Sequence, residues 1–351
     1  MLYQSNYTHG GDIYTDGVPL DFSVNTNPFR APESVIQAMM EAVAFSDRYP
    51  DPYCREAVKA VSGYEGVPQD YILLGNGAAE LIYSFAAAVK PGCILEASPT
   101  FTEYSKAVEV TGGEVVRYPL AKDNGFVLQS DILDFIDKSE AEVLFLCNPN
   151  NPTGRLIDSD LLHDILERCQ SRNIRLVLDE CFMDFTGKHS GMNAFLETYP
   201  NLIILKALTK NYALAGIRIG YCLCADNRLL HEMSRIVQPW NVSVIAQAAI
   251  KAALKERKYI IESCKTIQIE REWLMLQLKS IGLWVCPSDA NYLLFQGPIG
   301  LDNALKNKGI MIRNCSDFAG LDQGWYRIAV RQHPDNAVLI NTLRTILGKE
   351  A

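Results

Sequence analysis

The sequence lacks the features that mark several large classes of protein. No apolar run approaches the roughly 18 residues that a membrane-spanning helix needs, and the opening segment MLYQSNYTHGGDIY has neither the basic stretch nor the apolar core of a secretory signal. Basic residues are in the minority, with Lys+Arg 33 against Asp+Glu 41 and a net charge of −8, which argues against a general nucleic-acid binder. We therefore expect a cytoplasmic protein that binds neither membranes nor nucleic acids.

Metal-binding and dithiol motifs are also missing. The 10 cysteines are scattered and no C-x-x-C spacing occurs, so neither a zinc ribbon nor a redox dithiol is expected. Several cysteines end apolar, strand-like runs, such as Cys147 in LFLC and Cys181 in LDEC. This placement predicts buried, reduced thiols, and no metal site is predicted.

The chain does contain a regular alternation of short apolar runs and helical patterns. Between residues 71 and 207 the runs are rich in Val, Ile and Leu, as strands covered on both faces are; they are YILL, CILEA, EVVRYPL, EVLFLC, IRLVLDE and LIILKA. Helical patterns separate them. The alternation predicts an α/β fold with a mainly parallel sheet sandwiched by helices.

The pattern changes after about residue 230. A helical stretch from roughly 242 to 280 precedes the strand-like runs NYLLFQ, GIMIRN and WYRIAV and two further helices, which predicts a smaller α+β domain. We expect an N-terminal arm over 1–30 that packs near the small domain, a large domain over 31–235 with its core from about 45, and the small domain over 236–351.

Four polar segments stand at the carboxyl ends of predicted strands or in the turns that follow them, where ligands of open α/β sheets bind. In GNGAAE (75–80) the glycines permit unusual backbone angles, and the N–H groups of Ala78 and Ala79 open a helix, which is a ready anion site. The alternative is an ordinary strand–helix turn. The G-x-G-x-x-G dinucleotide fingerprint is incomplete here, which disfavours a nicotinamide site.

The other three segments offer an amide, a carboxylate and an amine. Asn151 in NPNNPTG could donate to a ligand oxygen, although turn chemistry alone also explains that motif. Asp179 ends the apolar run LVLDE, where a carboxylate needs a protonated ring nitrogen, a metal or an arginine as partner, unless it caps a helix. In LTKNYALAGIRIGY, Lys210 could form a Schiff base, and Thr209 and Arg218 suit a phosphate. A solvated loop charge is the alternative for a lone lysine.

Together these groups meet the chemical needs of pyridoxal phosphate. A lysine holds its aldehyde as an imine, an aspartate keeps its pyridine nitrogen protonated so that the ring accepts electrons, and a helix N-terminus, a hydroxyl and an arginine hold its phosphate. With NPNNPTG, DECF and TK…G-x-R-x-G-Y in this order, the sequence resembles the fold-type I pyridoxal-phosphate enzymes over essentially its whole length. The branch is that of histidinol-phosphate aminotransferases and threonine-phosphate decarboxylases, which implies an aspartate aminotransferase-like fold with a seven-stranded-type sheet.

The resemblance also assigns roles to residues. Lys210 would be the Schiff-base lysine, Asp179 the partner of the ring nitrogen and Asn151 a donor to the ring hydroxyl. Phe101 in SPTF would stack on the ring. Tyr49 in RYPD would reach the phosphate in a neighbouring subunit's site, which implies a homodimer with shared active sites. The residues that would hold the phosphate within the chain are Ala78, Ala79, Thr209 and Arg218.

Two positions depart from the family pattern. Phe182 stands where many aminotransferases have a tyrosine that hydrogen-bonds the ring hydroxyl, and the loss of that donor should shift the pKa of the imine. Ala207 stands three residues before the lysine, where many relatives carry a hydroxyl. The phosphate site should therefore have one donor fewer.

Three segments resemble the threonine-phosphate decarboxylases in particular: HGGDIY, DFSVNTNP (21–28) and IMIRNC…GLDQGWYRIAVR (310–331). By that resemblance Arg327 would bind the substrate α-carboxylate, and the residues around the substrate would be His9, Asn151, Arg313 and Arg327. A histidine and two arginines can hold a phosphate and a carboxylate together. The alternative for His9 is a mobile tail residue outside the site. The alternative for Arg313 is a surface charge at the end of a strand. The implied reaction converts L-threonine O-3-phosphate to (R)-1-aminopropan-2-yl phosphate for the cobalamin side chain.

Other activities fit the same cofactor residues. A histidinol-phosphate or related aminotransferase would share the cofactor site and a phosphorylated substrate. Serine phosphate differs from threonine phosphate by one methyl, which a pocket distinguishes by only about 1–3 kcal/mol. A ligand-sensing regulator would need an appended DNA-binding domain, for which the arm is too short. A dead enzyme is disfavoured because Lys210 and Asp179 are both present.

Overall fold

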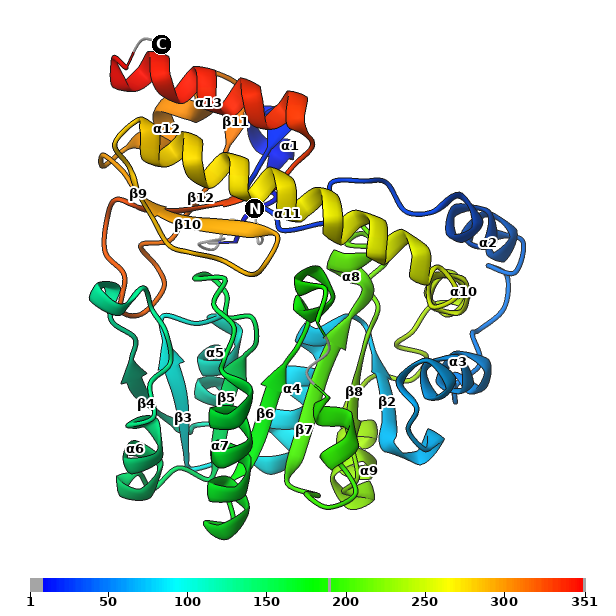
Figure 1. The fold of residues 1–351 in the computed structure, drawn as a ribbon. Coiled ribbons are helices and arrows are strands. Elements are labelled where there is room, and N and C mark those ends of the chain that lie inside the picture. The colour runs from blue at the N-terminus through cyan, green and yellow to red at the C-terminus, as the bar shows by residue number, and fades with distance from the viewer. Residues whose placement is uncertain (1–8, 189–190, 350–351) are drawn as a thin grey trace.

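The computed structural model describes residues 9–188 and 191–349, and a seven-stranded sheet forms its centre (Figure 1). The strand order is β2-β8-β7-β6-β5-β3-β4. Strand β8 runs antiparallel to β2 and β7, whereas the other neighbours pair in parallel. The predicted mainly parallel sheet is therefore confirmed. Its strands are β2 (Ile72–Gly75), β3 (Cys93–Ser98), β4 (Glu114–Pro119), β5 (Val143–Cys147), β6 (Arg175–Asp179), β7 (Leu202–Ala207) and β8 (Gly220–Cys224).

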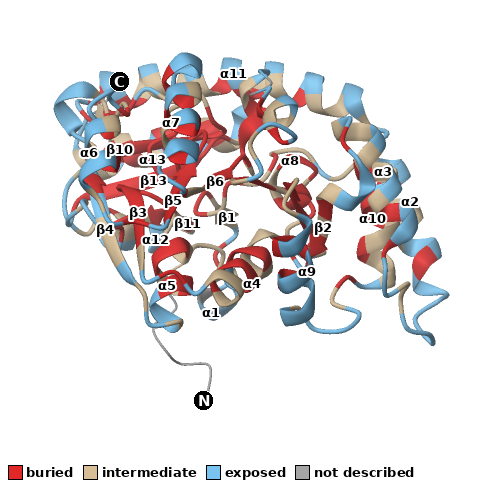
Figure 2. Cartoon of the chain, turned by 90° about the horizontal axis from the view of Figure 1, so that it is seen from below, coloured by how far each residue is buried: buried red, intermediate tan, exposed pale blue. Residues whose placement is uncertain are grey.

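Helices cover both faces of this sheet (Figures 1 and 2). Successive residues of β5 point to opposite faces: Phe145 packs in one apolar cluster and Leu144 in another, and both side chains are buried. The cluster of Phe145 includes α4 (Ala78–Val89), α5 (Glu103–Val110) and α9 (Asn227–Ile236). The cluster of Leu144 includes α6 (Ile132–Lys138) and α7 (Ser159–Ser171). Burial on two faces explains why the strands are continuous apolar runs.

The helical stretch expected over 242–280 is two helices, so the prediction of one stretch is wrong. Helix α10 (Val244–Ala253) packs against α2 (Glu33–Val43) and α3 (Arg55–Glu65), and α11 (Arg257–Ser280) leads from there to the small sheets (Figure 1). The backbone leaves the helical region at Glu256, with ψ 49°, and Ser34 Oγ donates to the Glu256 carboxylate at 2.5 Å. The break lets each helix bury its own apolar face.

A four-stranded antiparallel sheet, in the order β12-β13-β10-β9, forms the second layer. The predicted strand GIMIRN is divided, because Ile310–Met311 pairs with the arm and Arg313–Asn314 with β13. The elements of this part are β9 (Trp284–Val285), β10 (Tyr292–Gln296), α12 (Leu301–Lys306), β11 (Ile310–Met311), β12 (Arg313–Asn314), β13 (Trp325–Ala329) and α13 (His333–Leu347).

The N-terminal arm contains two short elements where an irregular chain is expected. Helix α1 (Ile13–Asp16) precedes β1 (Leu20–Asp21), which pairs in parallel with β11. Phe22 is fully buried in the core of the small sheet, and its carbonyl accepts from the Ala329 N–H at 2.8 Å. A buried segment needs partners for its backbone polar groups, which is why strand pairing appears here. The boundaries at 30/31 and 235/236 stay a prediction.

All 10 cysteines are free thiols and most are buried, as the sequence predicts.

Within the described part of the chain, no helix combines the length and the apolar character needed to cross a bilayer.

A glycine in β8 brings this strand against the start of α4. Gly220 lies opposite Gly75 of β2. A Cβ added at Gly220 would lie 2.8 Å from the Ala78 nitrogen and 2.9 Å from the Lys206 carbonyl oxygen. Both are backbone atoms, so they cannot move aside without shifting the strand or the helix.

We expect Gly220→Ala to lower the free energy of unfolding by about 1–3 kcal/mol, as overpacking does. Gly63 is a matched control, because it lies in α3 with nothing within 4 Å of an added Cβ; Gly63→Ala should be neutral or stabilising by up to about 1 kcal/mol. Urea unfolding of both variants measures the difference. Equal stability of the two would contradict the close approach.

Candidate active site

A cavity of about 590 Å³ lies where the carboxyl edge of the large sheet faces the small antiparallel sheet. Of the predicted site residues it is lined by His9, Ala78, Ala79, Phe101, Asn151, Asp179, Thr209, Lys210, Arg218, Arg313 and Arg327. A second cavity of similar size, about 580 Å³, between α3 and α11 contains none of them. The structure thus brings together every predicted site residue except Tyr49.

The topology of the sheet explains this convergence. Phe101 follows β3, Asn151 follows β5, Asp179 ends β6 and Lys210 follows β7, so parallel pairing places all four at one edge. Arg218 precedes β8, and this strand runs the opposite way. The reversal of β8 therefore returns Arg218 to the same edge.

One end of the cavity is built for an anion. Ala78 and Ala79 open α4, whose N-cap is Gly77 with φ +81°. A Cβ on Gly77 would lie 2.6 Å from Arg218 Nη2, so the guanidinium packs directly against the helix start. Free N–H groups, a guanidinium and the Thr209 hydroxyl together suit a phosphate. Ala207, which also lines the cavity, adds no hydroxyl.

Asp179 is buried and held by two donors. Its carboxylate accepts from the Tyr104 hydroxyl at 2.6 Å and from the Cys181 N–H at 3.0 Å. Tyr104 is fully buried and stacks on Phe145, with ring centroids 5.0 Å apart. Burial and the Asp179 charge raise the pKa of Tyr104, so it stays a neutral donor. Sequence reasoning missed Tyr104, because its only signal is a tyrosine on the apolar face of a helix.

Lys210 lies in the four-residue helix α8 (Leu208–Asn211). The Asn27 N–H donates to the Lys210 carbonyl at 2.8 Å, which fixes the backbone of the lysine. Burial, followed by the Arg327 and Arg218 cations, lowers the pKa of Lys210 to about 8. A fraction of the amine is then neutral near pH 7, as a nucleophilic lysine requires.

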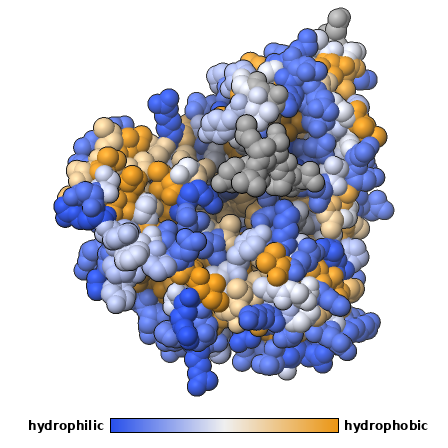
Figure 3. Space-filling model, turned by 180° about the vertical axis from the view of Figure 1, so that it is seen from behind, coloured by the Kyte–Doolittle hydropathy of each residue, from blue (hydrophilic) through white to orange (hydrophobic). Residues whose placement is uncertain are grey.

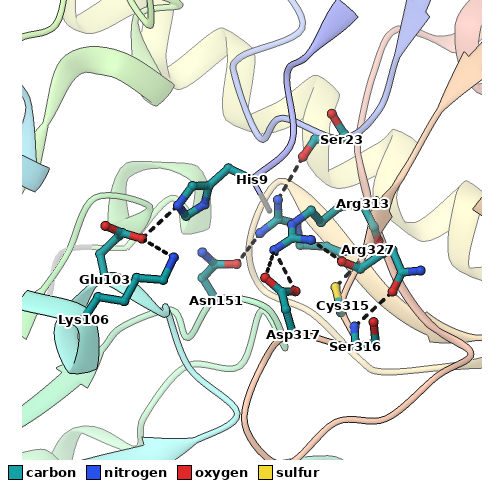
Figure 4. Close-up of polar contacts among 11 residues, drawn as sticks. His9, Ser23, Glu103, Lys106, Asn151, Arg313, Cys315, Ser316, Asp317 and Arg327 are labelled. Carbon is teal, nitrogen blue, oxygen red and sulfur yellow. Dashed lines mark hydrogen bonds and ion pairs between the residues drawn. The ribbon is translucent and has the colours of Figure 1, made fainter. Parts of the chain in front are cut away.

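Arg327 in β13 is a buried cation whose partners are neutral. It donates through Nη1 to Asn151 Oδ1 and through Nη2 to the Ser23 carbonyl at 2.9 Å, and its Nε has no hydrogen-bond partner (Figure 4). Burial lowers the pKa of Arg327. No ion pair to Arg327 occurs among residues 9–188 and 191–349. Because Arg327 occupies the amide oxygen of Asn151, the amide nitrogen is left to donate toward the cavity.

Arg313 differs from Arg327 because it has a carboxylate partner. Its Nη2 donates to both Asp317 oxygens at 2.7 and 2.8 Å, and its guanidinium lies 5.2 Å from the centre of the Phe318 ring. The cavity therefore holds one paired and one unpaired guanidinium from the small sheet.

The arm histidine reaches the cavity, whereas Tyr49 does not. His9 Nε2 lies 2.8 Å from Glu103 Oε1 (Figure 4); Glu103 also lines the cavity and was not predicted. Tyr49 is 74% exposed and stacks on Trp240 with centroids 4.1 Å apart. It contributes nothing to the cavity of its own chain.

The residues fit a bound pyridoxal phosphate on structural grounds. The anion site at α4, the Asp179 carboxylate and the Lys210 amine lie in one cavity, and they suit the phosphate, the ring nitrogen and the aldehyde. Arg327 remains for an anionic group of a second ligand.

Known proteins resemble this chain over most of its length. The sequence model of the family described as aminotransferase class I and II matches residues 18–343. The threonine-phosphate decarboxylase of Salmonella typhimurium (strain LT2) is 35% identical, with 97% of each chain covered. A histidinol-phosphate aminotransferase of Caldanaerobacter subterraneus is 31% identical, with 95% of each chain covered.

Among solved structures, the histidinol-phosphate aminotransferase of Clostridium acetobutylicum superposes with a TM-score of 0.87 at 30% identity, over 94% of this chain and 100% of that one. The family match, the sequence identities and the shared fold agree. The chain belongs to the class I and II aminotransferase family and is a pyridoxal-phosphate-dependent enzyme.

Proposed function

We propose that the chain decarboxylates L-threonine O-3-phosphate, releasing carbon dioxide and leaving (R)-1-aminopropan-2-yl phosphate. The observation that carries this proposal is the position of His9, Arg313 and Arg327 in the cavity of Lys210. They offer positively charged or hydrogen-bonding groups for both a carboxylate and a phosphate. The decarboxylase relative at 35% identity supports the same substrate class.

The cofactor would be held by residues of the large sheet. Ala78, Ala79, Thr209 and Arg218 would bind its phosphate, and Lys210 would attach to its aldehyde carbon. Asp179, fixed by Tyr104, would keep a proton on the ring nitrogen, and Phe101 would lie against the ring. When bound, the cofactor supplies a conjugated ring that accepts the electron pair released at the substrate α-carbon.

The substrate would be held by residues of the small sheet and the arm. Arg327 would bind the α-carboxylate, because its buried charge has no carboxylate partner in the described chain. His9 and Arg313 would hold the phosphate, and Asn151 would contact both the ring hydroxyl and the substrate. With its carboxylate and its phosphate both held, the substrate can turn only one bond of its α-carbon toward the cofactor ring. That orientation selects the bond that breaks.

In the proposed reaction the bond between the α-carbon and the carboxylate carbon breaks. Carbon dioxide leaves without the electron pair, and the α-carbon takes up one proton. The Lys210 amine can hold that proton at Nζ, since its pKa of about 8 leaves both protonation states populated near neutral pH. No oxidant or second substrate is needed.

A histidinol-phosphate aminotransferase is the second candidate. It is favoured by the TM-score of 0.87 to such an enzyme, against 0.83 for the L-threonine-O-3-phosphate decarboxylase of Porphyromonas gingivalis. It would use the same cofactor residues and would transfer the amino group of histidinol phosphate to 2-oxoglutarate, which leaves a ketone and releases no carbon dioxide.

A paired assay on the holoenzyme separates these candidates. We expect carbon dioxide from L-threonine O-phosphate alone, and little glutamate from L-histidinol phosphate with 2-oxoglutarate. Glutamate without carbon dioxide would establish the aminotransferase.

Lys210→Ala should abolish turnover, because it removes both the attachment point and the proton carrier. Full turnover by Lys210→Ala would contradict the assigned lysine.

We also propose that the enzyme is a homodimer in which Tyr49 completes the neighbouring site. Apolar side chains gather on the side formed by α2 and α10, at the left of the view in Figure 3. Met40, Tyr49 and Tyr53 are exposed by 65, 74 and 69%. So many large exposed side chains on one side are typical of a subunit interface.

Subunit mixing tests this arrangement. Tyr49→Ala and Lys210→Ala should each lower activity strongly, because each breaks every site of its own homodimer. After exchange of subunits, mixed dimers contain one site with neither change, so activity should partly return. Activity that stays at the sum of the two separate variants would exclude a shared site.

A further inference from the structure

One carboxylate that lines the cavity, Glu103, has no role in the proposed chemistry. Glu103 is the first residue of α5, lines the cavity and has a side chain 14% exposed. It accepts from His9 Nε2 at 2.8 Å, from Lys106 Nζ at 2.9 Å and from the Tyr83 hydroxyl at 3.0 Å. The bond from His9, followed by those from Lys106 and Tyr83, lowers the pKa of Glu103 to about 2 despite its burial. Glu103 is therefore an anion at neutral pH.

An anion at this point cannot itself bind a phosphorylated substrate. A carboxylate facing a phosphate dianion repels it unless cationic or donor groups lie between them. The donors that surround Glu103 include a side chain from the arm, His9 (Figure 4). The effect of Glu103 on a ligand must therefore act through the groups that it holds.

The arm connects His9 to the substrate arginine by a short series of contacts. A Cβ on Gly10 would lie 2.5 Å from the Ser23 carbonyl oxygen, so the arm backbone packs directly on Ser23. The Gly11 N–H donates to Ser23 Oγ at 2.8 Å, with Gly11 at φ +95°. The Ser23 carbonyl in turn accepts from Arg327 Nη2 at 2.9 Å. The two glycines thus permit a close arm contact that only residues without a side chain can make.

This series fixes one end of the arm at Arg327 and the other at Glu103. We propose that Glu103 is a positioning residue that determines specificity for a phosphorylated substrate. It holds the His9 ring at a set separation from Arg327, so that a ligand with a carboxylate at one end and a phosphate at the other is bound at both. This inference rests on the proposed function, because it takes His9 as a phosphate ligand.

The experiment is a double-mutant cycle on the holoenzyme with Glu103→Ala, His9→Ala and the combination. Two quantities are measured: the Kd of inorganic phosphate by calorimetry at constant ionic strength, and KM and kcat for carbon dioxide release from L-threonine O-phosphate. Glu109→Ala is the matched control, since Glu109 is an exposed glutamate on the same helix. Glu103→Gln keeps the size of the side chain and removes its charge, and it replaces the alanine variant if that variant does not fold.

We expect Glu103→Ala to weaken phosphate binding and to raise KM on the order of tenfold, as the loss of a charge-assisted hydrogen bond does, with little change in kcat. Glu103→Gln should change both in the same direction, and Glu109→Ala should match the wild type. In the His9→Ala background Glu103→Ala should add little, because the two residues act as one unit.

Unchanged phosphate affinity in Glu103→Ala would overturn the inference. So would a loss of affinity on Glu103→Ala that is the same in the wild-type and the His9→Ala backgrounds. Glu103 and His9 could prove coupled in the binding of inorganic phosphate while the wild type releases no carbon dioxide from L-threonine O-phosphate. In that case the proposed function fails and the role of Glu103 stands. Carbon dioxide release without coupling between Glu103 and His9 would overturn the inference alone.

Discussion

A buried guanidinium without a carboxylate partner constrains the whole site. Among residues 9–188 and 191–349, Arg327 donates only to an amide oxygen and a backbone carbonyl, and its Nε has no partner there. Leaving a buried ion unpaired costs several kcal/mol, so such a group persists where a ligand supplies the missing anion. The same charge helps to lower the pKa of Lys210. One arginine thus favours an anionic substrate and a reactive lysine in the same cavity.

The fold places these charges together through strand direction. Parallel strands deliver Asp179 and Lys210 to one sheet edge, and the reversed β8 returns Arg218 to it. Gly220 lets β8 approach the start of α4, which brings the guanidinium beside the helix N–H groups. The small sheet and the arm then close the cavity from the other side. The residues proposed to hold the cofactor consequently come from the large sheet, whereas Arg313 and Arg327 come from the small sheet and His9 from the arm.

The cofactor half of the site could be predicted because its signals are local. Asp179 ends one apolar run and Lys210 closely follows another, so the end of each run is visible in the sequence itself. Tyr104 and Glu103 could not be found this way, because their partners are distant in the sequence. Tyr104 is 75 residues from Asp179, and Glu103 is 94 residues from His9. The break between α10 and α11 could not be predicted either. The helix-forming pattern of the sequence continues through Leu254, and only the packing of α10 against α2 shows that the helix axis must turn there. Sequence resemblance supplied His9, and its contact with Glu103 required the folded arm.

The most direct test of the account locates the lysine that holds the cofactor. The holoenzyme is treated with sodium borohydride, which fixes the cofactor to its lysine, and the digested chain is analysed by mass spectrometry. Lys206 is an internal control, because it lies four residues upstream of Lys210. Burial alone would lower the pKa of Lys206, but the Glu65 carboxylate at 2.9 Å and the Glu180 carboxylate raise it, so Lys206 stays protonated. We expect one modified residue, Lys210. Modification of Lys206 or of a lysine outside the cavity would contradict it.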